Sequence, residues 1–303
     1  MAERLGYGGL RLCKKVCKTF CMIRATANAD GPLFILNSSV SGPAVYLDNW
    51  AIGDLAEGDS ARRKRFIDAM HCGMDLLFSV ANAAELSGPQ GRSAEAVRMF
   101  LDDIGPRWFP VELNLVNVMQ RELNGVHPNR ACISEKFLKS YVARLIQGYT
   151  GKVIILSDDF FRLGGVLDWV GADRESIRKG SAESDELLRG KIGKAARCKR
   201  DEGWLNQRFP LIPFNPSLRA SFVFQNLLRI LVQAGTFKKG DALDFCHAVM
   251  AAAFASFATL DSHWKLRIES LPKPNQLARI YCASELDQMV TDMELWLAHR
   301  AAS

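Results

Sequence analysis

Acidic side chains stand at both ends of an apolar segment in the stretch DALDFCHAVMAAAFASFATLD, residues 241–261. Asp241 and Asp244 lie at its head and Asp261 closes it, while residues 248–260 carry no charge. Acids beside apolar sequence are expected to be partly buried, and buried carboxylates are costly unless they are paired or bind a cation. The stretch therefore predicts negative charge gathered around a buried element.

Two further acids stand beside apolar sequence elsewhere in the chain. Asp48 follows the run AVYL, which is typical of a short buried strand, and Glu85 stands in the small-residue segment SVANAAEL. If the fold brings these two together with Asp244 and Asp261, the four carboxylates repel one another and their pKa values rise unless a cation shares the site.

A hard divalent cation, Mg²⁺ or Mn²⁺, is the one that such oxygen ligands prefer, and it keeps several of its waters. A site of this kind can hold a phosphate oxygen, lower the pKa of a bound water and stabilise an in-line displacement. Phosphodiester hydrolysis is therefore the leading reaction for the four acids.

Each acid also has a purely structural explanation. Asp48 could cap a following helix, Glu85 could be an exposed helix residue, and Asp261 could begin a turn. Asp241 and Asp244 fit the first turn of a helix, where the helix dipole favours acids. For any single acid the structural explanation is the more common one. The functional hypothesis rests on the acids as a set, because every structural explanation would have to hold at once.

His247 stands one turn after Asp244. It could approach a scissile phosphate as a general acid. At this spacing it more often orients a carboxylate or packs in the core, and both roles stay open at this point.

The elements that must position these residues alternate between short apolar strands and helices. Strands are predicted over residues 44–47, 75–78, 257–260 and 278–284, and a closing helix over residues 285–301. This alternation predicts an α/β fold in which helices cover both faces of a parallel sheet. Ligands of such sheets bind beyond the carboxyl ends of the strands, where the strand order reverses.

Domain organisation follows from the same pattern. Residues 43–303 are expected to form the domain that carries the acids, and residues 106–200 a mostly helical insertion or subdomain within it. Residues 1–42 are expected to be a basic and flexible N-terminal segment, most of whose charge would be lost if translation began at Met22.

Positive charge is concentrated in two segments. The chain has 39 Lys and Arg residues against 33 Asp and Glu residues, a net charge of +6. Residues 1–24 carry six cations and one acid, and residues 187–200 carry six cations and no acid. Such clusters fit a polyanion partner, because Lys and Arg release counterions from phosphates. A solvated surface is the more usual explanation of a charge cluster.

Other candidates for substrate contact stand near the acids in the sequence. Arg62 and Arg63 belong to a basic run, and Lys265 and Arg267 shortly follow the last acid, where they could steer phosphates. Trp50 could stack on a base, although burial in the core is more typical of tryptophan.

The order and context of the acids resemble the PIN-domain family of ribonucleases. The resemblance rests on VYLDNW around Asp48, on LLFSVANAAEL around Glu85, and on GDALDFCHAVMAAAFASFATLDSHW around Asp244 and Asp261. The last motif is the most specific. The resemblance covers residues 44–100 and about 215–300, and it implies a three-layer α/β/α fold around a parallel sheet and a metal-dependent nuclease.

By motif position the resemblance also assigns roles to single residues. Asp241 would be a fifth acid, and Ser79 and Thr259 would be supporting polar residues. Two features depart from the family: Ser256 stands where many members carry an acid, and the chain is closer in length to larger bacterial PIN-like proteins than to compact toxins. The catalytic metal ligands, direct or through water, would be Asp48, Glu85, Asp244 and Asp261.

A metal-dependent endoribonuclease is the function that these observations predict, with Mg²⁺ or Mn²⁺ as cofactor and RNA rather than single-stranded DNA as substrate. The alternative is a nucleic-acid-binding or regulatory PIN-like module whose site is weak or silent. The range 106–200 could serve as a substrate lid, as a homodimer surface or as a platform for another protein, such as an inhibitor. No uncharged run is long enough for a membrane helix and no secretory signal is evident, so a cytoplasmic protein without membrane contact is expected.

Overall fold

The computed structural model describes residues 23–26, 35–38, 40–88, 92–145, 161–198, 201–235 and 238–302. Within the expected N-terminal basic segment it describes the backbone of a two-stranded antiparallel sheet, β1 (Ile23–Thr26) and β2 (Ile35–Ser38), and residues 40–42. The expected flexibility of that segment, and the charges of Lys199 and Arg200, lie outside the described residues.

A five-stranded parallel sheet organises the rest of the described chain. Its strands are β3 (Ala44–Tyr46), β4 (Asp75–Ser79), β5 (Trp108–Val111), β6 (Phe257–Thr259) and β7 (Arg279–Tyr281), in the order β5-β4-β3-β6-β7. Strands β3, β4, β5 and β6 are buried throughout, as continuous apolar strands covered on both faces should be. The α/β class and the four predicted strands are confirmed, with bounds shifted by a few residues.

Strand β5 was not predicted from the sequence. It lies within residues 106–200, so this range is not wholly an insertion: its first residues supply an edge strand of the central sheet. The segment WFPV contains Pro110, which argues against a central strand because proline cannot donate to the ladder. At the edge of the sheet this deficit is tolerated.

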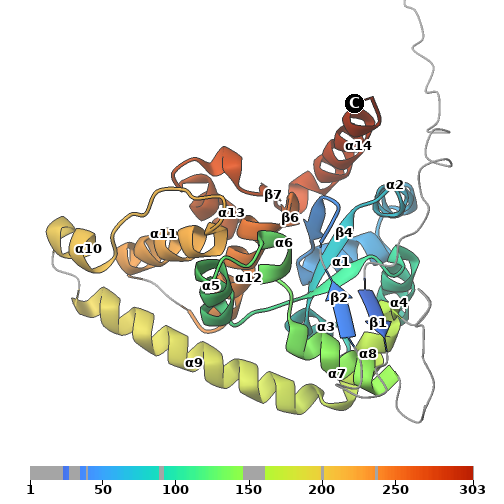
Figure 1. Cartoon of the computed structure of the whole chain (residues 1–303), viewed down its shortest axis with the longest axis horizontal. Coiled ribbons are helices and arrows are strands. Elements are labelled where there is room, and N and C mark those ends of the chain that lie inside the picture. Colours follow the sequence, from blue (N-terminus) through green and yellow to red (C-terminus); the bar gives the residue numbers. More distant parts are fainter. Residues whose placement is uncertain are drawn as a thin grey trace, which may run out of the picture.

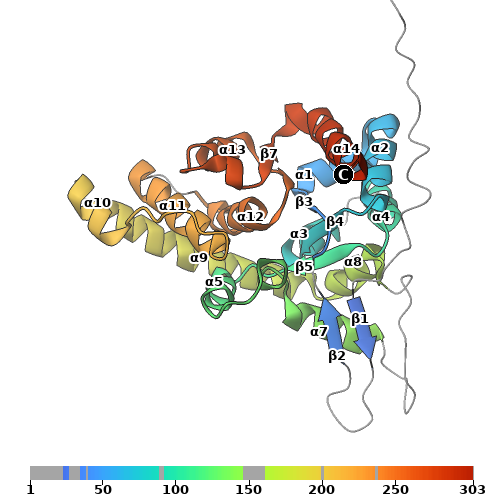
Figure 2. The same ribbon diagram turned by 45° about the horizontal axis from the view of Figure 1, so that its top comes forward.

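Helices surround the sheet in two groups that Figures 1 and 2 show on either side of it, an arrangement consistent with three layers. One group contains α1 (Asn49–Glu57), α2 (Ser60–His71), α4 (Arg92–Ile104) and α14 (Leu286–Ala302), and the other contains α9 (Arg174–Cys198), α11 (Arg219–Ala234) and α12 (Asp241–Phe254). No helix among the described residues is both long and apolar enough to cross a membrane.

The remaining helices connect these groups. They are α3 (Val80–Leu86), α5 (Leu115–Leu123), α6 (Pro128–Ala131), α7 (Glu135–Leu145), α8 (Leu163–Ala172), α10 (Glu202–Arg208) and α13 (Ser262–Glu269), with short 3₁₀ turns at Pro274–Gln276 and Ala283–Glu285.

Helix α12 corresponds to the apolar stretch of residues 241–261, and it is buried along most of its length. Ala242, Phe245 and every residue from 248 to 254 are buried. A helix that is apolar on all sides must lie inside the protein. The small side chains let neighbouring helices approach closely, and α12 packs against both α9 and α11.

A buried ion pair closes the amino-terminal end of the sheet. Asp75, the first residue of β4, is 0% exposed, and one of its carboxylate oxygens lies 2.6 Å from Nη2 of Arg107. The other oxygen accepts hydrogen bonds of 2.8 Å from the backbone N–H groups of Ser41 and Gly42. Asp75 therefore joins three segments of the chain at the end of the sheet opposite to the predicted site.

The long helix α9 supplies a cap for α12. Asp185 is 8% exposed although its helix is largely solvated, and its carboxylate accepts hydrogen bonds from the backbone N–H groups of Gly240, at 3.2 Å, and Ala242, at 3.1 Å. These are the first groups of α12, which lack partners inside their own helix. Asp185 thus fixes the helix that carries Asp244.

We expect Asp185→Ala to lower the free energy of unfolding by about 1–2 kcal/mol, the usual effect of removing a helix cap. Urea unfolding followed by circular dichroism would measure the change. Glu183→Ala, an exposed acid on the same helix, is the matched control and should change stability by less than about 0.5 kcal/mol. Equal effects of the two substitutions would refute the capping role.

Candidate functional site

The four predicted acids meet at one small hollow. It measures about 30 Å³, room for a few atoms, and lies where the carboxyl ends of β3 and β6 emerge. Asp48 follows β3 and Asp261 follows β6, while Glu85 comes from α3 and Asp244 from α12. The residues that line the hollow are Asp48, Asn49, Asn82, Glu85, Leu243, Asp244, His247, Leu260, Asp261 and Trp264.

This position is the reversal point of the strand order. The chain passes from β3 outward to β4 and β5, then returns to the other side of β3 with β6 and β7. Ligands of open parallel sheets bind outside the carboxyl ends at such a point. The hollow therefore lies where the sequence pattern predicts a ligand site.

Asp48 caps a helix and also lines the hollow, so it combines the two roles that were considered for it. Its carboxylate caps α1 by accepting a 2.8 Å hydrogen bond from the backbone N–H of Asn49, and its own N–H donates to Oγ1 of Thr259 at 2.8 Å. Thr259, expected to be a supporting residue, thus ties the end of β6 to the end of β3. Capping and participation in the site are compatible for this residue.

Two asparagines that were not predicted from the sequence connect Asp48 to Glu85. Nδ2 of Asn49 donates to the carboxylate of Glu85, and Nδ2 of Asn82 donates to Oδ1 of Asn49 at 2.8 Å. Ser79, expected to be a supporting residue, caps α3 in a reciprocal arrangement with Asn82. Residues 33 to 36 positions apart in sequence make these contacts, so no local pattern could have revealed them.

The expected burial of the acids is only partly correct. Asp48 is half-buried, whereas Glu85, Asp244 and Asp261 are exposed. The apolar neighbours of these three belong to the walls and floor of the hollow, and the carboxylates stand at its mouth. The acids are therefore accessible from solvent.

Two of the carboxylates have raised pKa values. Burial, together with the charges of Asp261 and Glu85, raises the pKa of Asp48 to about 6 against the opposing hydrogen bond from Asn49. Desolvation and the charges of Asp48 and Asp261 raise the pKa of Asp244 to about 7. Desolvation is the main cause of both shifts and the charges of neighbouring acids add to it, so Asp48 and Asp244 favour proton uptake near neutral pH.

Asp241 does not line the hollow. Its carboxylate accepts a 2.7 Å hydrogen bond from the backbone N–H of Lys238, in the turn that precedes α12. Its charge still contributes to the raised pKa of Asp244. The structure thus places Asp241 in a capping turn near the site, while Asp244 faces the hollow.

His247 belongs to a polar network in the wall of the hollow. Its Nδ1 is hydrogen-bonded to the hydroxyl of Tyr46, which is 1% exposed and lies 3.4 Å from Oδ1 of Asn82. Burial lowers the pKa of His247 to about 4. The ring is therefore neutral at pH 7 and packs against Tyr46 in the wall of the hollow, which fits the structural role better than that of a general acid.

The donor set of the hollow suits Mg²⁺ or Mn²⁺. Carboxylate and amide oxygens are hard ligands, and three of the four carboxylates are reachable from solvent. Within the part of the chain that the structure describes, no three His, Cys, Asp or Glu side chains are already placed to hold an ion. Asp244 and Asp261 are exposed, so their side chains can change rotamer and turn towards a cation. The suitability of the hollow for Mg²⁺ or Mn²⁺ therefore rests on which ligand types converge there and not on their present distances.

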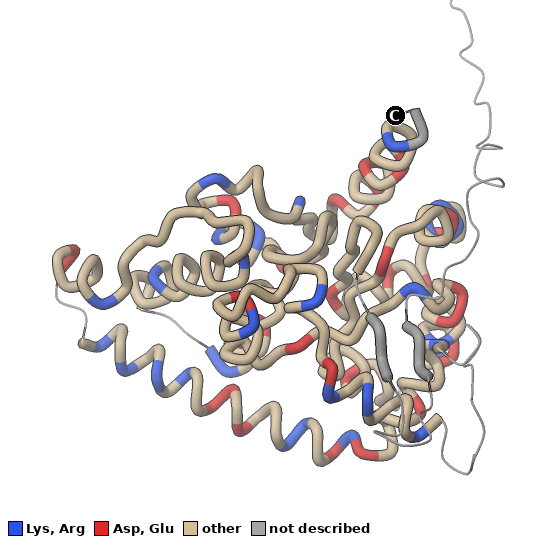
Figure 3. Tube along the Cα trace, viewed as in Figure 1, with Lys and Arg blue, Asp and Glu red and all other residues tan. Residues whose placement is uncertain are grey.

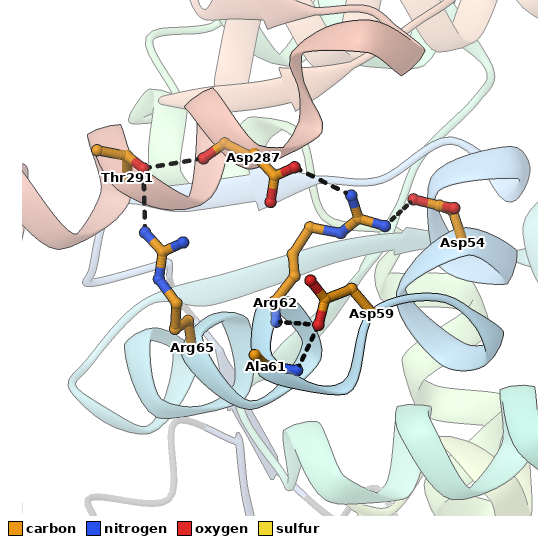
Figure 4. A network of polar contacts seen from close by, with 7 residues as sticks. All are labelled: Asp54, Asp59, Ala61, Arg62, Arg65, Asp287 and Thr291. Atoms are coloured by element: carbon orange, nitrogen blue, oxygen red, sulfur yellow. Dashed lines mark hydrogen bonds and ion pairs between the residues drawn. The ribbon is translucent and has the colours of Figure 1, made fainter.

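The predicted substrate cations are not gathered at the hollow. Figure 4 shows Arg62 between two acids, and its guanidinium nitrogens lie 2.5 Å from Asp54 and 3.3 Å from Asp287. Arg63 pairs with Asp103 at 2.7 Å. These two arginines therefore stabilise the packing of α2. Their acidic partners could not be predicted from the run of cations in which they stand.

The two cations after Asp261 differ from each other. Lys265 pairs with Glu285 at 2.5 Å and with Glu269 at 3.7 Å, so its charge is used within the fold. The guanidinium of Arg267 lies over the ring of Trp264, at 4.8 Å from its centre, and Trp264 lines the hollow. Arg267 thus contacts a residue that lines the hollow, although it does not line the hollow itself.

The two tryptophans near the site have different environments. Trp50 packs against the hydrophobic core, the more typical of its two proposed roles. Trp264, which was not predicted to belong to the site, is 1% exposed, and its indole Nε1 has no hydrogen-bond partner among the described residues. A buried N–H group beside the acids can donate to a water or to a phosphate oxygen.

Comparisons with known proteins do not identify the chain: no family model, no curated protein and no solved structure matches it.

Proposed function

We propose that this protein is a metal-dependent endoribonuclease with a PIN-like α/β/α fold. The observation that carries the proposal is the convergence of Asp48, Glu85, Asp244 and Asp261, from four separate elements, on one hollow at the reversal point of a parallel sheet. A structural cap has no need of three other carboxylates beside it. Desolvation and the neighbouring acids raise the pKa values of Asp48 and Asp244, and a bound cation would offset that cost.

Each residue has a role in this proposal. The carboxylates of Asp48, Asp244 and Asp261 would hold Mg²⁺ or Mn²⁺, in part through water, and Glu85 would complete the set. Asn49 orients Glu85 by donating to its carboxylate, and Asn82 in turn holds Asn49 by donating to its Oδ1. The bound cation supplies positive charge for a phosphate oxygen and for the attacking water. The neutral His247 holds Tyr46 and so keeps the wall of the hollow in place.

RNA is preferred over single-stranded DNA on the strength of the family resemblance, and the cytoplasmic location remains an expectation. A second candidate is a nucleic-acid-binding module with a silent site. It is favoured by one observation: no three acids among the described residues stand ready to hold an ion.

Cleavage of a labelled mixed-sequence RNA in Mn²⁺ tests the proposal, with matched single-stranded DNA in parallel. We expect the wild type to cut RNA, EDTA to abolish cleavage, and Asp244→Asn to slow it at least about 100-fold, because loss of a metal ligand removes several kcal/mol of transition-state stabilisation. Asp241→Asn should keep most of the activity, since Asn can accept the same hydrogen bond from Lys238.

The matched control is Asp68→Asn, which removes one exposed acid on α2 that pairs with Lys64. It should leave the rate unchanged. Failure of folded wild-type protein to cut either substrate in Mn²⁺ would favour the silent binding module, and equal losses in the Asp244 and Asp68 variants would remove the acids at the hollow from the mechanism.

A further inference from the structure

The second half of α9 carries cations that the fold does not use. From residue 187 to the end of the helix at Cys198 there are four cations and no acid: Arg189, Lys191, Lys194 and Arg197. Among the described residues, none of the four forms an ion pair, in contrast to Arg62, Arg63 and Lys265. Figure 3 shows this basic half of α9 along one edge of the molecule.

Two of these cations line a hollow of about 470 Å³ between α9 and the end of α11 at Gly235. Arg197 is exposed, and Arg189 is half-buried with its Nε buried and without a hydrogen-bond partner among the described residues. Glu186 also lines the hollow, but the two arginines outweigh it. Gly190 and Gly193 between them leave room for a ligand to approach the helix backbone.

The spacing of the arginines indicates the size of the ligand. Residues 189 and 197 are eight positions apart on one helix, a rise of about 12 Å at 1.5 Å per residue. Each arginine side chain reaches several ångströms from its Cα, so this pair alone does not exclude a single phosphate group. Together with Lys191 and Lys194, the arginines form a row of four cations along the helix, and an extended polyanion can contact more of this row than a small anion can.

The α9 hollow is linked to the acidic site through α12. Asp185, four residues before Arg189, is hydrogen-bonded to the first N–H groups of α12, and Asp244 stands in the first turn of that helix. Lys238 and Lys239, both exposed, lie at the same turn. A nucleic-acid chain on the basic half of α9 would therefore pass Lys238 and Lys239 at the turn that leads into the helix carrying Asp244.

We propose that the α9 hollow binds the sugar-phosphate backbone of single-stranded RNA and holds it for cleavage at the acids. This inference rests on the proposed function for the choice of RNA among polyanions. Arg189 and Arg197 are the principal contacts, with Lys238 and Lys239 between the hollow and the acids. Backbone contact of this kind is independent of base sequence.

Fluorescence anisotropy of a labelled single-stranded RNA with the full chain in EDTA tests the inference without cleavage. We expect Arg189→Gln with Arg197→Gln to weaken binding about 10-fold or more at low salt, and to reduce the slope of log Kd against log salt by about 1.4, since each lost phosphate contact on a single strand removes about 0.7. The Lys pair, Arg189→Lys with Arg197→Lys, keeps the charges and should keep most of the slope.

The matched control is Arg178→Gln with Lys179→Gln, two exposed cations at the other end of the same helix. It makes the same change in net charge and should alter binding much less. The inference would be overturned if this control weakened binding as much as Arg189→Gln with Arg197→Gln does. It would also be overturned if the wild type did not bind RNA. If the wild type binds RNA through this face but does not cut it in Mn²⁺, the proposed function fails, while the α9 hollow stands as an RNA-binding surface. If the wild type cuts RNA and the changes at Arg189 and Arg197 affect neither binding nor cleavage, the inference fails and the proposed function stands.

Discussion

Asp48→Asn should make the protein more stable at pH 8, although it removes a residue of the proposed active site. The folded state raises the pKa of Asp48 from its ordinary 3.8 to about 6, so the folded protein holds this proton more tightly than the unfolded chain does. The stability that comes from proton uptake is fully present below about pH 4 and is lost as the pH rises through 6. Above that pH the ionised carboxylate destabilises the fold.

The size of the effect follows from the pKa. A change from 3.8 to about 6 corresponds to at most about 3 kcal/mol, and screening of this half-buried group by solvent lowers the expected gain to about 1–2 kcal/mol at pH 8. Asn at this position can still accept the capping hydrogen bond from the N–H of Asn49. We therefore expect wild type and variant to have similar free energies of unfolding at pH 4 and to diverge towards pH 8.

Denaturant unfolding in EDTA at several pH values would measure the difference. Adding Mn²⁺ should then stabilise the wild type, by about 2.7 kcal/mol when the free ion exceeds its Kd 100-fold, and stabilise Asp48→Asn much less. Asp68→Asn controls for the loss of one surface charge and should follow the wild type in both conditions. A pH-independent difference between Asp48→Asn and the wild type would mean that the fold does not raise the pKa of Asp48.

Asp75→Ala should lower the free energy of unfolding by about 3–5 kcal/mol, the largest change expected in this protein. Removal of one partner leaves the guanidinium of Arg107 uncompensated, with only 17% of its side chain exposed. The backbone N–H groups of Ser41 and Gly42 lose their acceptor as well. Both losses occur beside the amino end of the central sheet.

Thermal and urea unfolding would test this expectation. Asp103→Ala is a suitable control because it removes an acid from an ion pair of similar length, with Arg63, whose carboxylate is 54% exposed. It should cost no more than about 1 kcal/mol. Arg107→Ala and the double variant complete a cycle that isolates the pair itself; a cost for Asp75→Ala as small as that for Asp103→Ala would contradict the role of the buried pair.

The sheet could be predicted from sequence where its strands are apolar and short. AVY, DLLFS and FAT are buried runs followed by helix-forming sequence, and each became a strand. Strand β5 was not predicted because Pro110 argues against a strand. The proline is tolerated only because β5 lies at the edge of the sheet. Edge position is a property of the assembled sheet and not of any window of sequence.

The site could be predicted in part for a similar reason. Acids at strand ends and helix starts are local features, so Asp48, Glu85, Asp244 and Asp261 could be selected, and the topology of a parallel sheet places strand ends together. The partners of Arg62 and of Asn82 are distant in sequence, and no spacing encodes them. The exposure of Glu85, Asp244 and Asp261 could not be predicted either. Their apolar neighbours in the sequence point into the core, while the carboxylates themselves face solvent.

The two ends of the central sheet place opposite demands on charge. Asp75, where β4 begins, is paired with Arg107 and held by backbone N–H groups, whereas Asp48, beyond the end of β3, is desolvated beside other acids and destabilises the fold when it is ionised. The two residues lie at opposite ends of the sheet and share no contact. Stability gained or lost at the amino end can therefore be varied without changing the carboxylates of the proposed site.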